Sequence, residues 1–199
     1  MPNKTVKGFR WIRGEGRTGS PAIEEGVVAS GYGTAIYEGV PVRRIDDGTF
    51  TVAAAGATIY GICCGINQYY DSGDGRVKKP LGPSPKLLPA STSYTGIDRE
   101  SRIAIIPVAG NLFEADFNAA IATTTLAGAR AFLGTNGDHV ISSDDAALNA
   151  SDFVANDATP ASAGWTAVDV AIDQDFTASR IKFIVRCNEP QIVPSSTGL

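Results

Sequence analysis

The stretch SRIKFIVRC, residues 179–187, carries the clearest structural pattern in this chain. From Ile181 onward one face of the segment is apolar and comprises Ile181, Phe183, Val185 and Cys187. Lys182 and Arg186 fall on the opposite face. Because successive side chains of a strand point to opposite faces, this alternation predicts a β-strand with one buried side and one wet side.

A second segment, TAVDVAID at residues 166–173, repeats the same period. Its predicted apolar face comprises Thr166, Val168, Val170 and Ile172. Asp169 and Asp173 fall on the other face and could lie opposite the cations of the final strand. The residues between the two segments, 173–179, could connect them as a hairpin.

Further short apolar runs lie upstream, each closed by Gly, Asp or Pro, at residues 26–30, 34–45, 49–55, 58–66 and 102–117. Several strands with turn signals about every 8–12 residues are typical of a sandwich or a barrel. The chain has 22 Gly and 11 Pro, which also favours many turns. No helical patterns of 10–15 residues alternate with these runs, which argues against a doubly wound α/β sheet. The sequence therefore predicts an all-β fold, a small β-barrel or β-sandwich.

The chain divides into an extended amino-terminal arm, residues 1–25, and a single β-rich domain, residues 26–199. Residues 71–96 are rich in Gly, Pro and Ser, which predicts a long excursion rather than a core strand. Residues 119–133 are ambiguous, because Ala and Leu allow a helix and the threonines oppose one. Residues 134–164 are polar and rich in turn-forming residues.

The overall charge gives no sign of a polyanionic partner. Lys and Arg total 17 and Asp and Glu total 21, so the net charge is −4. This balance favours neither nucleic acid nor an anionic membrane. No apolar run approaches the roughly 20 residues that span a bilayer, and no apolar segment follows the basic start as in a secretory signal. Three cysteines do not make a disulfide framework, so a reducing compartment is expected.

The first 20 residues are basic, whereas the part of the chain after Glu114 is mostly acidic. The basic residues of that first segment, set against the single acid Glu15, are Lys4, Lys7, Arg10, Arg13 and Arg17. Two interpretations stay open: a solvated tail, and an arm that packs on an acidic partner surface. Under the second, a chain lacking residues 1–20 folds but no longer binds its partner.

The adjacent pair Cys63–Cys64 raises the question of metal or redox chemistry. If residues 58–66 form a strand, the two side chains point apart and cannot chelate one ion. Cys64 then shares a face with Ile62 and Ile66. Zinc sites need cysteines two to four residues apart and further ligands. Both thiols are therefore predicted to be small buried hydrophobes.

The other chemical motifs are equally weak. The single histidine, His139, follows a turn and is predicted to be a surface residue. Residues 14–20 lack the ending of a phosphate-binding P-loop, and residues 71–75 lack the closing Glu of a calcium loop. Asp144 and Asp145 with Asp138 could hold a cation, but adjacent acids in a polar loop are more simply solvated. We therefore expect no catalytic residues, no metal and no cofactor, and a protein that is not an enzyme.

Four segments resemble capsid decoration (cement) proteins of tailed bacteriophages. They are GFRWIRG at residues 8–14, the long stretch from Tyr37 to Asp71, IIPVAGNLFEAD at residues 105–116, and RIKFIVRCNEPQ at residues 180–191. The similarity covers most of the chain but consists of strands and turns, not catalytic signatures. The chain departs from the family pattern at Trp11, where Pro is frequent, and at the cysteine pair, where Val-like residues are usual.

This resemblance implies a virion structural protein that binds the outer surface of an icosahedral capsid and stabilises subunit boundaries. It implies the major capsid protein as partner, synthesis in the host cytoplasm, and a homo-oligomer, with a trimer favoured. Binding at many symmetric sites gains from multivalency without an active site.

Interface energy concentrates in buried aromatic residues and Arg. The arm and the excursion contain the spare apolar and arginine side chains of this kind. The predicted interaction residues are Phe9, Arg10, Trp11, Arg13, Leu81, Leu87, Leu88 and Tyr94.

Two other functions stay open. A β-rich glycan-binding virion module, such as a fibre or surface protein, would group exposed aromatics over a groove, and Tyr69 with Tyr70 is the local candidate. A cytosolic β-barrel enzyme would bring titratable groups together in a pocket.

Overall fold

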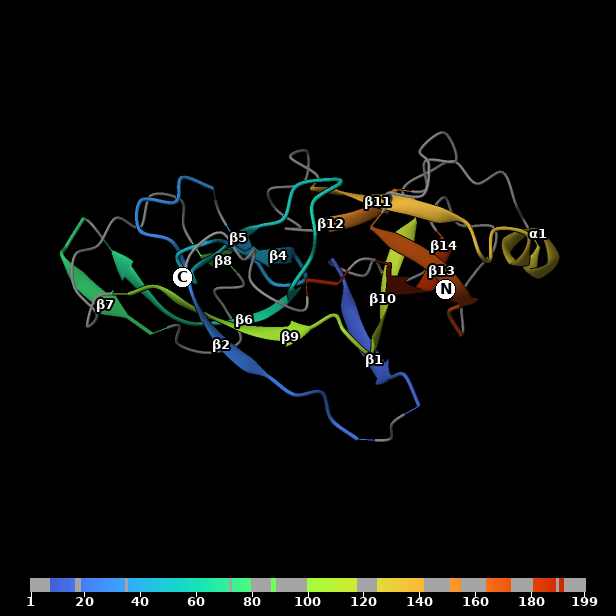
Figure 1. Cartoon of the computed structure of the whole chain (residues 1–199), viewed down its shortest axis with the longest axis horizontal. Coiled ribbons are helices and arrows are strands. Elements are labelled where there is room, and N and C mark those ends of the chain that lie inside the picture. Colours follow the sequence, from blue (N-terminus) through green and yellow to red (C-terminus); the bar gives the residue numbers. More distant parts are fainter. Residues whose placement is uncertain are drawn as a thin grey trace.

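The computed structural model describes residues 8–16, 19–34, 36–71, 73–79, 87–88, 100–117, 125–141, 151–154, 164–172, 181–188 and 190–191. In this part of the chain, nearly all regular structure is β, as the sequence predicts. The strands form two main sheets, in which most strand pairs are antiparallel. Each sheet lies in its own half of an elongated molecule (Figure 1).

The first sheet contains strands from the amino-terminal and middle parts of the chain. In order of pairing these are β2 (Glu24–Val27), β9 (Arg102–Pro107), β6 (Gly61–Asp71), β4 (Pro41–Arg44) and β5 (Phe50–Val52). The short strand β7 (Arg76–Lys78) extends β6 as a hairpin, and β3 (Ile36–Tyr37) pairs separately with β8 (Leu87–Leu88). The interior side of the first sheet holds a buried apolar cluster that includes Val28, Val42, Cys63, Ile103 and Ile105.

The second sheet combines β1, from the amino-terminal part of the chain, with strands from the carboxyl-terminal half. In order of pairing these are β1 (Arg10–Gly14), β10 (Asn111–Phe117), β12 (Ser151–Val154), β11 (Asn136–Ile141), β13 (Trp165–Val170) and β14 (Ile181–Cys187). Strand β14 also pairs antiparallel with β10.

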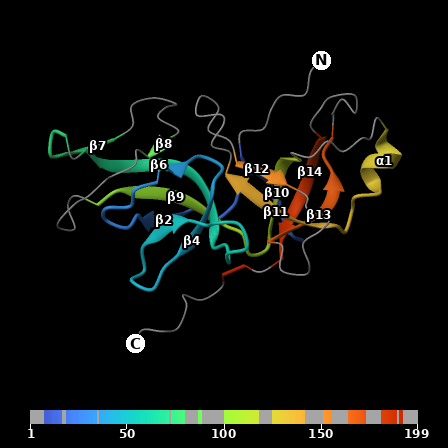
Figure 2. The same cartoon turned by 90° about the horizontal axis from the view of Figure 1, so that it is seen from above.

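In each half, the contact that would close a ring of strands is a single residue pair. Phe117 pairs with Phe153 in the second sheet, and Val28 pairs with Phe50 in the first. Closure into a hydrogen-bonded barrel is therefore not seen. The two sheets lie beside one another along the long axis in both views (Figures 1 and 2).

The two halves share a buried cluster, which we call the junction core. Its members come from both sheets and include Phe9, Ile62, Ile106, Trp165 and Phe183. Because apolar burial is the main stabilising term in folding, this shared core helps to hold the two halves together.

The pattern of β14 is confirmed, and that of β13 is not. Ile181, Phe183, Val185 and Cys187 all lie in the junction core. In β13 the register shifts between Ala167 and Asp169, so Trp165, Ala167 and Val170 are the buried residues. Ile172, predicted to be buried, is 85% exposed. A β-bulge adds a residue to one strand and reverses the faces across it, so Ala167 and Val170 share the buried face. Ile172 lies beyond the end of β13 at Val170, where the strand alternation no longer applies.

The region 134–164, expected to be turn-rich, contains β11 and β12. In the ambiguous region 119–133, residues Leu126–Arg130 form helix α1. Thr125 accepts a hydrogen bond from the Gly128 amide through its hydroxyl, so a threonine that would oppose a helix interior caps its start.

The described part of residues 1–25 is extended but belongs to the sheets of its own chain. β1 pairs with β10 over residues Arg10–Gly14, and β2 begins at Glu24.

The start of the 71–96 excursion continues the β6–β7 hairpin, where Lys78 binds the carboxylates of Asp71 and Asp74. Asp71 pairs with Arg76, so the described residues here belong to a hairpin, as the sequence predicts for a turn.

Candidate interaction surface beside strand β1

Strand β1 lies at an edge of the second sheet. Within the described residues it pairs with β10 alone, so its other edge has no strand partner there. The register shifts between Trp11 and Arg13, which marks a bulge at Ile12. Unpaired strand edges present free N–H and C=O groups, which can bind a strand from another chain.

The two arginines of β1 are exposed, and Trp11 is half-buried against the junction core. The Arg10 guanidinium lies 3.0 Å from the carboxylate of Glu114, which is largely buried on β10. The Arg10 side chain is 64% exposed, so solvent screens this pair and its net contribution is small. Arg13, two residues after Trp11, is exposed and places a positive charge at the surface of the edge strand.

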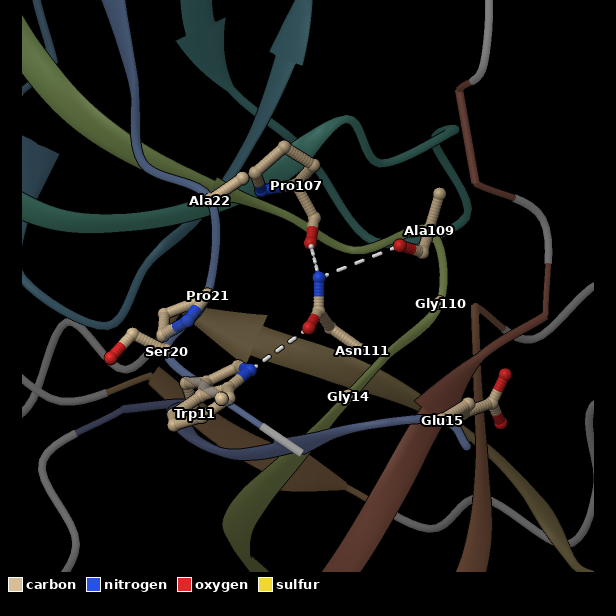
Figure 3. Close-up of a pocket in the computed structure, with 11 residues that line it drawn as sticks. Trp11, Gly14, Glu15, Ser20, Pro21, Ala22, Pro107, Ala109, Gly110 and Asn111 are labelled. Atoms are coloured by element: carbon tan, nitrogen blue, oxygen red, sulfur yellow. Dashed lines mark hydrogen bonds between the residues drawn. The ribbon is translucent and has the colours of Figure 1, made fainter. Parts of the chain in front are cut away.

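A cleft of about 400 Å³ opens beside β1 (Figure 3). Its walls come from β1, from residues 19–22 and from the turn between β9 and β10. Most wall positions are Gly, Ala or Pro, so the surface is formed by backbone and small apolar groups. Glu15 and Ser20 supply the polar side chains near the rim.

Asn111 fixes one wall of this cleft. Its amide nitrogen donates to the Pro107 carbonyl at 2.9 Å, and its Oδ1 accepts from the indole N–H of Trp11 at 2.9 Å (Figure 3). The indole is thereby held in place along the cleft. A pre-positioned, partly exposed Trp is the kind of residue that supplies binding energy without a large ordering cost.

The structure brings Arg10, Trp11 and Arg13 together, but corrects the prediction for Phe9. The Phe9 side chain is only 3% exposed and stacks on Trp165 of its own chain, with 4.3 Å between ring centroids. An apolar ring enclosed in this way is not available to another chain. The sequence gives no sign of this, because Trp165 is distant along the chain.

Of the predicted residues of the excursion, the two that the structure describes are not part of this surface. Leu87 and Leu88 form β8, which pairs with β3 in the other half of the molecule. Leu81 and Tyr94 lie outside the described residues. The cleft residues Pro21 and Asn111 were missed, because they carry no motif and only the turn between β9 and β10 brings them near Trp11.

Cys63 and Cys64 point to opposite sides of β6, as predicted. Cys63 is fully buried in the first sheet, and Cys64 packs against the junction core. Ile66 packs on the side of Cys63, not that of Cys64, because the register shifts between Cys63 and Gly65. Burial raises the pKa of Cys63 to about 12, so its thiol is protonated at neutral pH.

This arrangement predicts that the thiol of Cys63 reacts slowly in the folded protein. With a disulfide reagent at about pH 8, the half-buried Cys64 should react before Cys63, and all 3 thiols should react in denaturant. Mass spectrometry of the labelled peptides measures the order. Rapid labelling of Cys63 in the native protein would contradict its burial.

Replacing Cys63 and Cys64 together by valine is expected to leave fold and binding intact. Valine has two γ-methyl groups in place of one sulfur, so at the fully buried Cys63 the added volume is expected to cost about 1–3 kcal/mol, as small-to-large changes in a core usually do. Urea unfolding measures stability, and loss of function at unchanged stability would reveal a chemical role for a thiol.

The prediction that His139 is a surface residue is wrong, because its side chain lies buried in β11 and is 1% exposed. Ala53, which hydrogen-bonds its ring, is 86 positions away in the sequence.

Within the described residues, no group of three or more His, Cys, Asp and Glu side chains is placed to hold a metal ion. Among those same residues, no helix is both long and apolar enough to cross a membrane.

Tyr69 and Tyr70, the candidates for glycan binding, are both half-buried. Tyr69 packs against the core of the first sheet. The pair therefore does not form an open aromatic platform.

No family model, curated protein or solved structure matches the chain.

Proposed function

We propose that this chain is a virion structural protein that binds the outer surface of a phage capsid and stabilises subunit boundaries there. The proposal rests first on the resemblance to capsid decoration proteins. Three of the four resembling segments contribute β1, β10 and β14, which are adjacent strands. The fourth, residues 37–71, contributes β4, β5 and β6 of the first sheet, so the similarity covers strands in both halves of the fold.

The observation that carries the proposal is the surface beside β1. It combines an edge strand, a positioned Trp11, the exposed cation Arg13 and a cleft of small residues. Such an edge suits an extended segment of a shell subunit, bound through main-chain hydrogen bonds, and the arginine favours an acidic one. Repetition over a symmetric shell makes weak individual contacts sufficient.

Binding to shells tests this directly. Particles of the phage that encodes the chain, stripped of it, should bind the purified protein saturably and become more resistant to heat. Arg13→Glu should weaken binding about tenfold or more, because it places a carboxylate against the acidic partner. Arg43→Glu, the same charge change on an exposed residue of β4, is the matched control and should bind normally.

Binding should also weaken as salt is added, since exposed charges are screened. Equal losses in the two variants would show that overall charge matters and not the β1 surface. A protein that does not bind the shell at all would overturn the proposed function.

We further propose that the chain acts as a homotrimer, since closed symmetry presents the same surface to several shell subunits. Sedimentation of the free protein, and of protein released intact from particles, should give a trimer mass. A monomer in both states would refute the trimer but not shell binding.

A further inference from the structure

The buried imidazole of His139 connects the two halves of the molecule. The ring belongs to β11 in the second sheet, and its Nε2 lies 2.7 Å from the carbonyl oxygen of Ala53, which follows β5 of the first sheet. Its Nδ1 lies 3.4 Å from the indole nitrogen of Trp165. The ring is thus held on both sides by groups from different parts of the fold.

These contacts select one form of the ring. A carbonyl only accepts, so Nε2 carries the proton and donates to Ala53. The indole N–H only donates, so Nδ1 is unprotonated and accepts from Trp165. The neutral ring therefore satisfies both contacts, and neither side is left without a partner.

Adding a proton at Nδ1 would set two donors against each other. The new N–H would face the indole N–H of Trp165, and its remaining acceptor is the Asp138 carboxylate, 3.3 Å away. That oxygen already accepts the backbone N–H of His139 at 2.9 Å. A ring that turns toward Asp138 gives up its bond with Trp165 and strains the one with Ala53.

The charged surroundings of the ring are simple within the described residues. Asp138, on β11 itself, is the charged group that acts on it. The segment after β5 presents the Ala53 carbonyl, and β13 presents the indole of Trp165, neither of which carries a charge.

We propose that His139 is a pH-dependent latch between the two sheets: the neutral ring holds the Ala53 and Trp165 contacts together, and protonation releases them. Nothing in the proposed shell-binding function requires this device.

The sign of the effect follows from burial. Burial lowers the pKa of His139 below its ordinary value of 6.5, with Asp138 and the Ala53 bond opposing this in part. The opened state binds the proton more readily than the closed one. The stabilising contribution of the latch is therefore complete above about pH 6.5 and decreases as pH falls toward the lower native value.

Hydrogen exchange of the full chain tests the latch. After correction for intrinsic rates, opening in peptides that contain Ala53 and Trp165 should increase up to about 30-fold between about pH 8 and pH 5, as an opened-state pKa near 6.5 allows. Peptides from the β6–β9 pairing serve as an internal control. His139→Gln keeps a donor and an acceptor but does not titrate, so its opening should not change with pH.

A second measurement keeps the test decisive if that variant folds poorly. His139 is the single histidine, so its imidazole proton signals in a spectrum of the natural sequence are assigned without mutation. They should titrate below pH 6.5, together with the indole N–H signal of Trp165. Titration at or above 6.5, or the same pH dependence of opening in His139→Gln, would overturn the proposal.

Discussion

Replacing Phe9 with alanine is expected to lower the free energy of unfolding by about 3–5 kcal/mol, the usual cost of truncating a buried phenylalanine. The ring is buried in the junction core and stacks on Trp165, which is itself fully buried. Its backbone N–H also donates to the Gly39 carbonyl in the first half of the molecule, at 2.9 Å. Urea unfolding followed by circular dichroism measures the loss.

Arg13→Ala on the same strand is the control. Its side chain is exposed, so a change within about 0.5 kcal/mol is expected. The sequence alone predicts that a chain lacking residues 1–20 stays folded. The structure reverses this expectation, because such a chain loses Phe9 and β1. A Phe9→Ala protein as stable as Arg13→Ala would restore the interpretation of a free arm.

Gly61→Ala is expected to destabilise the protein by about 1–3 kcal/mol through overpacking. A Cβ at this position would lie 2.3 Å from Cγ2 of Ile105 and 2.7 Å from the Ile106 carbonyl oxygen on β9. The carbonyl belongs to a paired strand and cannot move without disturbing the β6–β9 ladder. Thermal and urea unfolding of the variant measure the effect.

Gly65→Ala, on the same strand, is the matched control. Its Cβ would meet only the Ala104 Cβ, at 3.8 Å, which is an ordinary contact. Its stability should change by less than about 0.5 kcal/mol. Equal effects at the two glycines would mean that backbone flexibility, and not the close approach of β9, explains the glycine at position 61.

The sequence predicts strands well where alternation is uninterrupted. In β14 every predicted buried residue is buried. In β13 and β6 a bulge changes which residues share a face, so Thr166 does not share the buried face of Val170, and Ile66 does not share that of Cys64. Bulges depend on pairing with another strand, which local periodicity does not contain.

Long-range contacts limit the prediction of the site in the same way. Arg10, Trp11 and Arg13 could be selected from the sequence, because exposed aromatic and Arg residues in a glycine-rich segment suggest binding. The burial of Phe9 and His139 depends on Trp165 and Ala53, which only the folded chain brings close. The same holds for Asn111, which positions Trp11.

Cryo-electron microscopy of the phage particle whose genome encodes this chain tests the central proposal most directly. We expect density for both sheets on the outside of the capsid, over boundaries between shell subunits, with the β1 edge and Trp11 in contact with the shell. Particles whose heads lack the chain, or in which it occurs only in the tail, would contradict the proposed function.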